Sequence, residues 1–237
     1  MKFSIITVCF NSGKTIRRTF ESVLNQTVPD YEYIVVDGAS TDDTLEIIKE
    51  YEPKFNGRMR CVSEPDKGIY DAMNKGIRMA QGEIIGIVNS DDYYETDALE
   101  KLIPYLENPA DVYYGIIRTF NEEGEVAILR HSHLSWKNTS VQHPAFFVSK
   151  QAYEKYGLFD LQYKISADHE LALRFIKANA RFVPVNAVLT NYSLGGVSSL
   201  SPTYEVHKIR FRYGFISRKT YYLHLLTAFI SKRLFRW

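Results

Sequence analysis

Apolar runs and amphipathic segments alternate along the first half of the chain. Short runs rich in β-branched residues indicate strands at residues 3–8, 33–36, 59–62 and 84–88. Between and after them, apolar residues three or four positions apart predict helices at residues 16–24, 45–52, 69–80 and 96–106. This strand–helix alternation predicts an α/β fold with a mostly parallel, doubly wound, Rossmann-like sheet.

The pattern changes after residue 110. Residues 112–119 and 126–129 predict an antiparallel hairpin, because a polar turn separates them. Later segments predict strands at 145–148 and 182–189, helices at 151–156 and from residue 168, and a loop at 193–202. The second half is therefore expected to be α+β in character. We expect one catalytic domain at 1–205, with halves of about 1–115 and 116–205, and a tail at 206–237.

The composition is that of an ordinary globular domain, with 237 residues of which 45% are hydrophobic. Cys9 and Cys61 both lie in apolar runs, which favours core packing in a reducing compartment over a disulfide framework. The N-terminal residues enter a strand pattern directly and show no signal-peptide pattern. A cytoplasmic location is expected.

The tail differs electrically from the rest of the chain. The net charge is +1, but residues 206–237 hold eight Lys or Arg and no acidic residue. Apolar residues near helical spacing predict a basic amphipathic helix there, and its longest uncharged run, 220–231, is too short to span a bilayer. The helix either lies in the inner membrane interface or packs on the catalytic domain or a second subunit.

Candidate chemistry is concentrated where the apolar run at 84–88 stops. Asn89, Ser90, Asp91 and Asp92 follow it directly. In open α/β sheets the ligand crevice lies at the carboxyl ends of the strands. Paired carboxylates at such an edge suit a hard cation such as Mg²⁺, which is held together with substrate phosphates. The alternative is that Asp91 and Asp92 cap the helix expected near Thr96.

Four motifs in order carry a family resemblance: residues 4–11 (SIITVCFN), 34–42 (IVVDGASTD), 74–83 (NKGIRMAQGE) and 89–92 (NSDD). Together they resemble the family 2 glycosyltransferases, which have the GT-A fold, over residues 3 to about 195. The segment 68–76, GIYDAMNKG, resembles the branch that assembles bacterial capsular, exopolysaccharide and O-antigen repeat units.

The resemblance implies a nucleotide-sugar donor and a divalent metal, Mg²⁺ or Mn²⁺. It makes Asp92 the metal ligand, and it gives Asp91 or Asn89 the ribose contact, because Asn89 replaces a charge of the usual acidic motif. The other residues that it implies for the donor are Thr7, Phe10 stacked on the base, Asp37 hydrogen-bonded to the base, and Lys67 as a charge for the diphosphate. Asp37 as a turn aspartate and Lys67 as a solvated loop lysine are the alternatives.

On the acceptor side, Asp168 in the segment 166–174 resembles the base that removes a proton from the acceptor hydroxyl. The helix start also explains Asp168 as an N-cap, a role that does not exclude the base, and Glu170 is the next candidate base. A substrate contact by His143 is also left open. The resemblance implies inverting transfer to a saccharide, expected to be lipid-diphosphate-linked, in bacterial surface polysaccharide synthesis.

Other classes of function remain open. The chain can be a catalytically inactive nucleotide-sugar-binding or scaffolding protein, because fold does not fix function. A nucleotidyltransferase would need a glycine-rich, basic phosphate loop near the first strand, and the sequence has none there. No nucleic-acid partner is expected, and a homodimer is left open.

Overall fold

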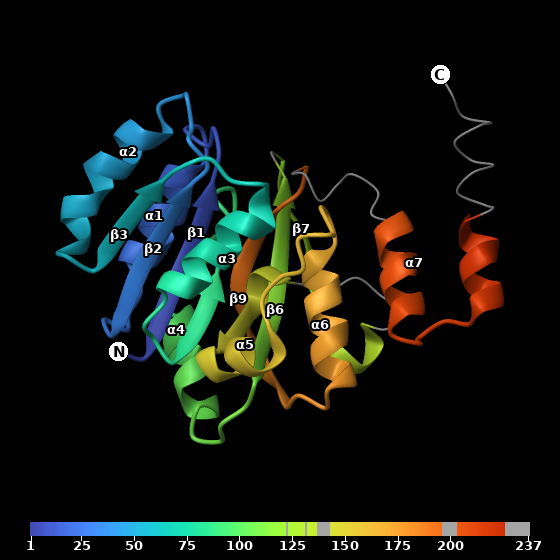
Figure 1. Cartoon of the computed structure of the whole chain (residues 1–237). Helices are drawn as coiled ribbons and strands as arrows, with labels where there is room; N and C mark the ends of the chain where they lie inside the picture. The colour runs from blue at the N-terminus through green and yellow to red at the C-terminus, as the bar shows by residue number, and fades with distance from the viewer. Residues whose placement is uncertain (122, 131, 137–142, 196–202, 226–237) are drawn as a thin grey trace.

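The computed structural model describes residues 1–121, 123–130, 132–136, 143–195 and 203–225. These residues form a nine-stranded sheet in the order β3-β2-β1-β4-β8-β6-β9-β5, with β7 paired to β6. In Figure 1, the blue N-terminal strands lie at one end of the molecule and α6 and α7 at the other.

The first half follows the predicted alternation. Its elements are β1 (Phe3–Cys9), α1 (Ile16–Leu24), β2 (Tyr31–Asp37), α2 (Thr44–Tyr51), β3 (Met59–Ser63), α3 (Ile69–Met79), β4 (Ile84–Ile87), β5 (Tyr93–Tyr94) and α4 (Ala98–Leu102). Strands β3, β2, β1 and β4 are parallel neighbours. The predicted fold class is confirmed, and the carboxyl ends of these strands lie along one edge of the sheet.

The second half makes the sheet mixed. Its elements are β6 (Val112–Asn121), β7 (Gly124–Leu129), β8 (Phe146–Ser149), α5 (Lys150–Tyr156), α6 (Ala167–Lys177), β9 (Phe182–Ser193) and α7 (Thr203–Arg212). Strand β8 is antiparallel to both β4 and β6, whereas β6 and β9 are parallel. The predicted hairpin is confirmed as β6 and β7. Strand β9 runs four residues past the predicted end, and most of the predicted loop, residues 196–202, lies outside the described residues.

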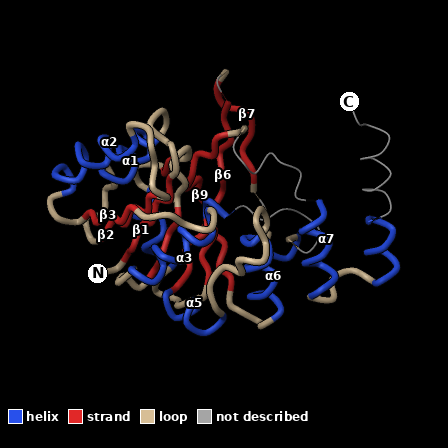
Figure 2. Tube along the Cα trace, turned by 45° about the horizontal axis from the view of Figure 1, so that its top comes forward, coloured by secondary structure: helices blue, strands red, loops and turns tan. Residues whose placement is uncertain are grey.

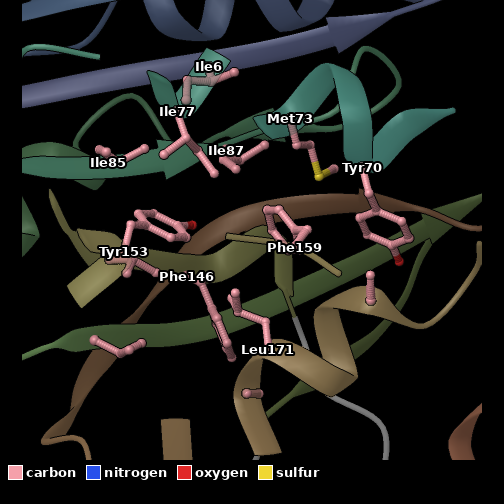
Figure 3. Close-up of a cluster of buried hydrophobic side chains, with 14 of the residues drawn as sticks. Ile6, Tyr70, Met73, Ile77, Ile85, Ile87, Phe146, Tyr153, Phe159 and Leu171 are labelled. Atoms are coloured by element: carbon pink, nitrogen blue, oxygen red, sulfur yellow. The ribbon is translucent and has the colours of Figure 1, made fainter. Parts of the chain in front are cut away.

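Two apolar clusters cover opposite faces of the sheet, because side chains alternate along each strand. In β1, Ile6 and Val8 pack with α3, α5 and α6, whereas Phe3 and Ile5 pack with α1, α2 and α4. Figure 3 shows the first cluster, in which the Tyr70 ring of α3 and the Phe159 ring lie beside one another. Their ring centroids are 5.3 Å apart. This cluster joins the two halves of the chain.

The approach of the chain to β1 depends on a glycine. A Cβ atom at Gly82 would lie 2.5 Å from the carbonyl carbon of Phe3 and 2.6 Å from the Ser4 nitrogen. Both are backbone atoms of a buried strand, so they cannot move aside. Only a residue without a Cβ atom therefore lets the chain pass this close to β1 before it enters β4.

The predicted boundary at residue 205 falls inside α7. This helix packs on α6, with Ile209 fully buried between them, and Figure 2 shows the two helices side by side. A further helical stretch follows at residues 218–225, where Tyr222 and Leu223 are exposed. Most of the predicted apolar stripe of the tail, residues 226–237, lies outside the described part of the chain. Among the helices that the structure describes, none has the length and apolarity to span a bilayer.

Candidate active site

The acidic motif occupies the short connection between β4 and β5. Asp92 is fully buried and Asp91 is half-buried. Asp92 Oδ1 accepts the backbone N–H of Ser193 at 2.8 Å, and its carbonyl oxygen accepts the Thr19 hydroxyl at 2.6 Å. The other carboxylate oxygen, Oδ2, is buried and has no hydrogen-bond partner among the residues that the structure describes. Asn89 Oδ1 is also buried and has no hydrogen-bond partner among the described residues.

The electrostatics of the motif favour a cation. Burial raises the pKa of Asp92 well above its ordinary value, and the neighbouring Asp91 raises it further. Burial also raises the pKa of Asp91. A buried charge without a partner is costly, and a positive ion beside Oδ2 would remove that cost. Asp92 therefore has the chemistry of a metal ligand.

The alternative that these carboxylates cap a helix is wrong. Helix α4 begins at Ala98, and its N-cap position belongs to Asp97. Asp91 and Asp92 lie before β5 and do not reach that helix terminus. Their position is set instead by bonds to α1 and to the end of β9.

Loops from three strand ends are joined at this edge. The Ser12 and Ser90 hydroxyls are 2.8 Å apart, which links the loop after β1 to the acidic motif. Asn11 has a positive φ of 50°, donates its N–H to Ser40 Oγ at 2.8 Å and accepts the Thr41 N–H at 2.9 Å. The carboxyl ends of β1, β2 and β4 therefore form one connected surface.

The predicted donor residues on the first two strands have different surroundings. The Phe10 side chain is 62% exposed, so a ring face is open for stacking. Asp37 is fully buried, and its carboxylate accepts the Ser40 N–H and the Ser40, Ser63 and Cys9 side chains. These four bonds match the acceptor positions of a carboxylate. Asp37 therefore stabilises the turn that follows β2, and its contact with a nucleotide base stays a prediction.

Two further predicted donor residues are also placed. Thr7 is buried, and its hydroxyl accepts the Tyr33 hydroxyl at 2.8 Å inside the sheet. Lys67 is exposed in the loop before α3, where its backbone N–H donates to Asp71 Oδ2 at 3.0 Å. Neither position decides whether the residue contacts a donor, so both assignments stay predictions.

On the acceptor side, Asp168 is the second residue of α6. The N-cap position belongs to Ser166, so the alternative that Asp168 is the cap is wrong. Asp168 Oδ1 accepts the His169 N–H at 2.8 Å and lies 3.1 Å from the Tyr70 hydroxyl. Burial raises the pKa of Asp168 to about 6. A carboxylate with this pKa is ionised at neutral pH and is a stronger base than an exposed aspartate.

The residues next to Asp168 have structural surroundings. Glu170 is buried and pairs with Arg174 at 3.0 Å, so it is a weaker candidate base. Burial lowers the pKa of His169 to about 3 and that of His143 to about 4, which keeps both rings neutral. His143 packs against Phe146 and Phe159 instead of lying in a polar loop.

A groove on the surface of the described structure lies away from the acidic motif. This groove of about 840 Å³ lies at the opposite edge of the sheet, where Lys2, Glu83 and Lys150 belong to its lining. Within the described residues, no group of three or more His, Cys, Asp and Glu side chains has an arrangement for a metal ion. Mg²⁺ is usually held by one or two carboxylates together with substrate phosphates, and Asp92 offers one such carboxylate.

Comparison with known proteins decides the family. Residues 4–168, which include both the acidic motif and Asp168, match the family model described as glycosyl transferase family 2. The chain belongs to this family. It is a glycosyltransferase.

One relative of this glycosyltransferase is a PGL/p-HBAD biosynthesis glycosyltransferase of Mycobacterium bovis, with 30% identity over 204 residues. The alignment covers 83% of this chain and 79% of the relative. Among solved structures, S. aureus TarS 1-349 in complex with UDP-GlcNAc has a TM-score of 0.74 and 23% identity, over 90% of this chain and 66% of that one. The mannosyltransferase PcManGT of Pyrobaculum calidifontis, in complex with GDP-Man and Mn²⁺, has a TM-score of 0.65 and 18% identity, over 90% and 61%. These structural likenesses show the GT-A fold.

The structure of the glycosyltransferase places a residue beside the acidic motif that sequence reasoning missed. Arg18 of α1 donates to the Asp91 carbonyl at 2.9 Å and to Ser193 Oγ at 3.1 Å. Its guanidinium carbon lies 4.5 Å from the Tyr93 ring centroid and 4.4 Å from that of Phe120. In the sequence, Arg18 is one polar residue of an amphipathic helix, and no spacing links it to residues 91 or 193.

Proposed function

We propose that this glycosyltransferase moves a sugar from a nucleoside-diphosphate donor to an acceptor hydroxyl with inversion at the anomeric carbon. The observation that carries the proposal is the buried, unpartnered Oδ2 of Asp92 at the carboxyl edge of the sheet. A divalent cation held by Asp92 and the donor diphosphate would satisfy this oxygen. The UDP-GlcNAc complex of TarS and the Mn²⁺ complex of PcManGT support a nucleotide sugar and a metal.

In this proposal the strand-end surface binds the donor. The exposed Phe10 ring stacks on the base, Asp37 and Thr7 belong to the strands that shape the base site, and Lys67 faces the diphosphate. Asp91 or Asn89 takes the ribose. When bound, the cation offsets the negative charge that develops on the departing diphosphate.

Asp168 acts as the base on the acceptor side. Its carboxylate takes the proton of the acceptor hydroxyl, and the acceptor oxygen forms a bond to the anomeric carbon. The bond from that carbon to the diphosphate breaks, and the diphosphate leaves with the electron pair. The Tyr70 hydroxyl and the His169 N–H orient the carboxylate, because both lie within hydrogen-bond distance of Oδ1.

We further propose that the acceptor is a lipid-diphosphate-linked saccharide at the inner membrane face, in surface polysaccharide synthesis, and that the tail contacts the membrane. The exposed Tyr222 and Leu223 side chains lie beside Arg218 and Lys219, which gives apolar groups with basic neighbours. Basic residues near an anionic leaflet add about 1 kcal/mol each to membrane binding. Helix α7 packs on α6 through Ile209, and its Phe211 ring stacks on Tyr221 of the tail with ring centroids 4.7 Å apart.

The donor and metal assignments are tested by thermal unfolding with UDP-GlcNAc or GDP-mannose, with and without Mn²⁺. A ligand at one hundred times its Kd stabilises the native protein by about 2.7 kcal/mol. We expect a donor-dependent rise in Tm that needs Mn²⁺ and that is absent in Asp92→Asn. The control is Asp97→Asn, at the N-cap of α4, which should keep the full rise. Undiminished sugar transfer in excess chelator would refute the metal assignment.

The membrane assignment is tested by sedimentation with vesicles that contain anionic lipid. We expect salt-sensitive binding of the intact chain, and loss of binding after deletion of residues 218–237 with donor binding preserved. Equal sedimentation of the intact and truncated chains, or loss of folding on truncation, would favour the alternative that the tail packs on protein.

A further inference from the structure

The first turn of α7 is bonded to the backbone that precedes Asp168. Glu205 Oε1 accepts the N–H of Lys164 at 2.9 Å, and its Oε2 accepts those of Ile165 at 3.0 Å and Ser166 at 2.9 Å. Consecutive N–H groups that converge in this way form an anion-binding concavity. Hydrogen bonds to an ionised acceptor are roughly twice as strong as neutral ones, so residues 164–166, here called the base segment, are firmly tied to α7.

The base segment is also bonded from the opposite side. The Tyr70 hydroxyl of α3 lies 2.8 Å from the Ile165 carbonyl oxygen and 3.1 Å from Asp168 Oδ1. One hydroxyl has a single proton, so it donates to one of these oxygens at a time. Asp168 stands two residues after the base segment. Its position is therefore determined by α3 on one side and by Glu205 of α7 on the other.

We propose that Glu205 is a positioning residue for sugar transfer, which fixes the base segment and thereby places the Asp168 carboxylate against the acceptor hydroxyl. The proposal rests on the proposed role of Asp168 as the base. Glu205 acts through the backbone of residues 164–166 and not by contact with substrate. Through these bonds the first turn of α7 belongs functionally to the catalytic unit. Glu205 is the last acidic residue of the chain, and the basic tail follows it.

The charge and the two oxygens of Glu205 are both needed. A glutamine at this position keeps one oxygen, which can accept two of the three N–H groups. Its amide nitrogen then faces the third N–H, a donor against a donor. The negative charge of Glu205 also contributes to raising the pKa of Asp168, after burial, which is the main cause. Glu205→Gln thus changes both the placement and the basicity of Asp168.

The test compares Glu205→Gln with Asp168→Asn and the wild type. For Glu205→Gln we expect kcat to fall about tenfold, which corresponds to about 1.4 kcal/mol, with an unchanged donor Kd in the presence of Mn²⁺. We also expect the acid limb of kcat/KM to move below pH 6, because the loss of a negative charge lowers the pKa of Asp168. The matched control is Glu46→Gln in the first turn of α2, which should leave kcat and the acid limb unchanged.

The outcomes separate the two proposals. If Asp168→Asn transfers sugar at the wild-type rate, the base assignment is wrong. If Asp168→Asn is inactive while Glu205→Gln keeps the wild-type kcat and acid limb, the positioning role is overturned. A loss of activity only in proportion to unfolded protein, with an unmoved acid limb, would also overturn it. Should Glu205→Gln not fold, Glu205→Asp keeps the charge but shortens the side chain, and we expect a lower kcat with an acid limb near pH 6.

Discussion

Replacement of Asp168 by asparagine is expected to remove activity and to increase stability. Burial raises the pKa of Asp168 from 3.8 to about 6, so the folded protein binds this proton more tightly than the unfolded chain does. The stabilisation from protonation is present in full below about pH 4, and it is lost as the pH rises through 6. Above that pH the enzyme carries a destabilising carboxylate at the position that we propose for the base.

The size of the effect follows from the pKa. A difference of about two pKa units corresponds to at most about 3 kcal/mol of unfolding free energy at pH 7.5. Asparagine keeps an oxygen that can accept the His169 N–H and the Tyr70 hydroxyl, so little is lost in exchange. For a chain of this size, roughly 2–4 °C of Tm corresponds to each kcal/mol, so the increase should reach up to about 10 °C.

The assay measures sugar transfer and thermal unfolding of Asp168→Asn from pH 4 to pH 8. Transfer should fall by about 10²–10⁴-fold, the usual contribution of a general base. The gain in Tm should be largest above pH 7 and should vanish below about pH 4. In the wild type, kcat/KM should fall about tenfold between pH 7 and pH 5, as the base becomes protonated.

The control is Asp43→Asn, an exposed aspartate at the N-cap of α2, whose Tm difference should not follow this pH course. A near-wild-type transfer rate in Asp168→Asn would exclude Asp168 as the base. A lower Tm than the wild type at pH 7.5 would show that the carboxylate is not destabilising, and the pKa argument would then be wrong.

Three further changes test other parts of the site. Phe10→Ala should weaken donor binding about tenfold, since stacking on a base contributes about 1–3 kcal/mol, with little change in Tm because the ring is exposed; an unchanged donor Kd by titration would remove Phe10 from the base site. Tyr70→Phe deletes the hydroxyl 3.1 Å from Asp168 Oδ1 and should lower kcat several-fold at constant donor Kd, and a wild-type kcat would count against its orienting role. Gly82→Ala places a methyl group 2.5 Å from a backbone carbon of β1 and should cost about 1–3 kcal/mol in urea unfolding; a wild-type midpoint would contradict the packing described for β4.

Much of the fold was predictable because burial on both faces leaves a strong local pattern. Strands β1, β2 and β4 are buried throughout, and each appears in the sequence as a short β-branched run. The end of β9 was not predicted, because Thr190 and Asn191 are polar although both are buried. They continue the strand through ladder pairing with β5 and β6, which no hydrophobic pattern records.

The candidate site was predictable to a similar degree. The position of Asp91 and Asp92 followed from the end of an apolar run, and the placement of Asp168 on the first turn of a helix followed from its segment. The contacts of Arg18, Ser193 and Glu205 could not be predicted, since each joins residues far apart in the chain. In each contact one of the two bonded atoms belongs to the backbone, which carries no residue-specific signal.

The bond from the Ser193 N–H to Asp92 Oδ1 spans 101 positions of the sequence, and this separation affects how the enzyme is made. Ribosomes add about 5–20 residues per second. Ser193 is therefore synthesised roughly 5–20 seconds after Asp92. During this interval β1 to β4 can already pair, because their contacts are nearer in sequence. The growing chain therefore has its parallel strands before its acidic motif is complete, and under the proposed function it gains the ability to bind a donor only after β9 joins the sheet.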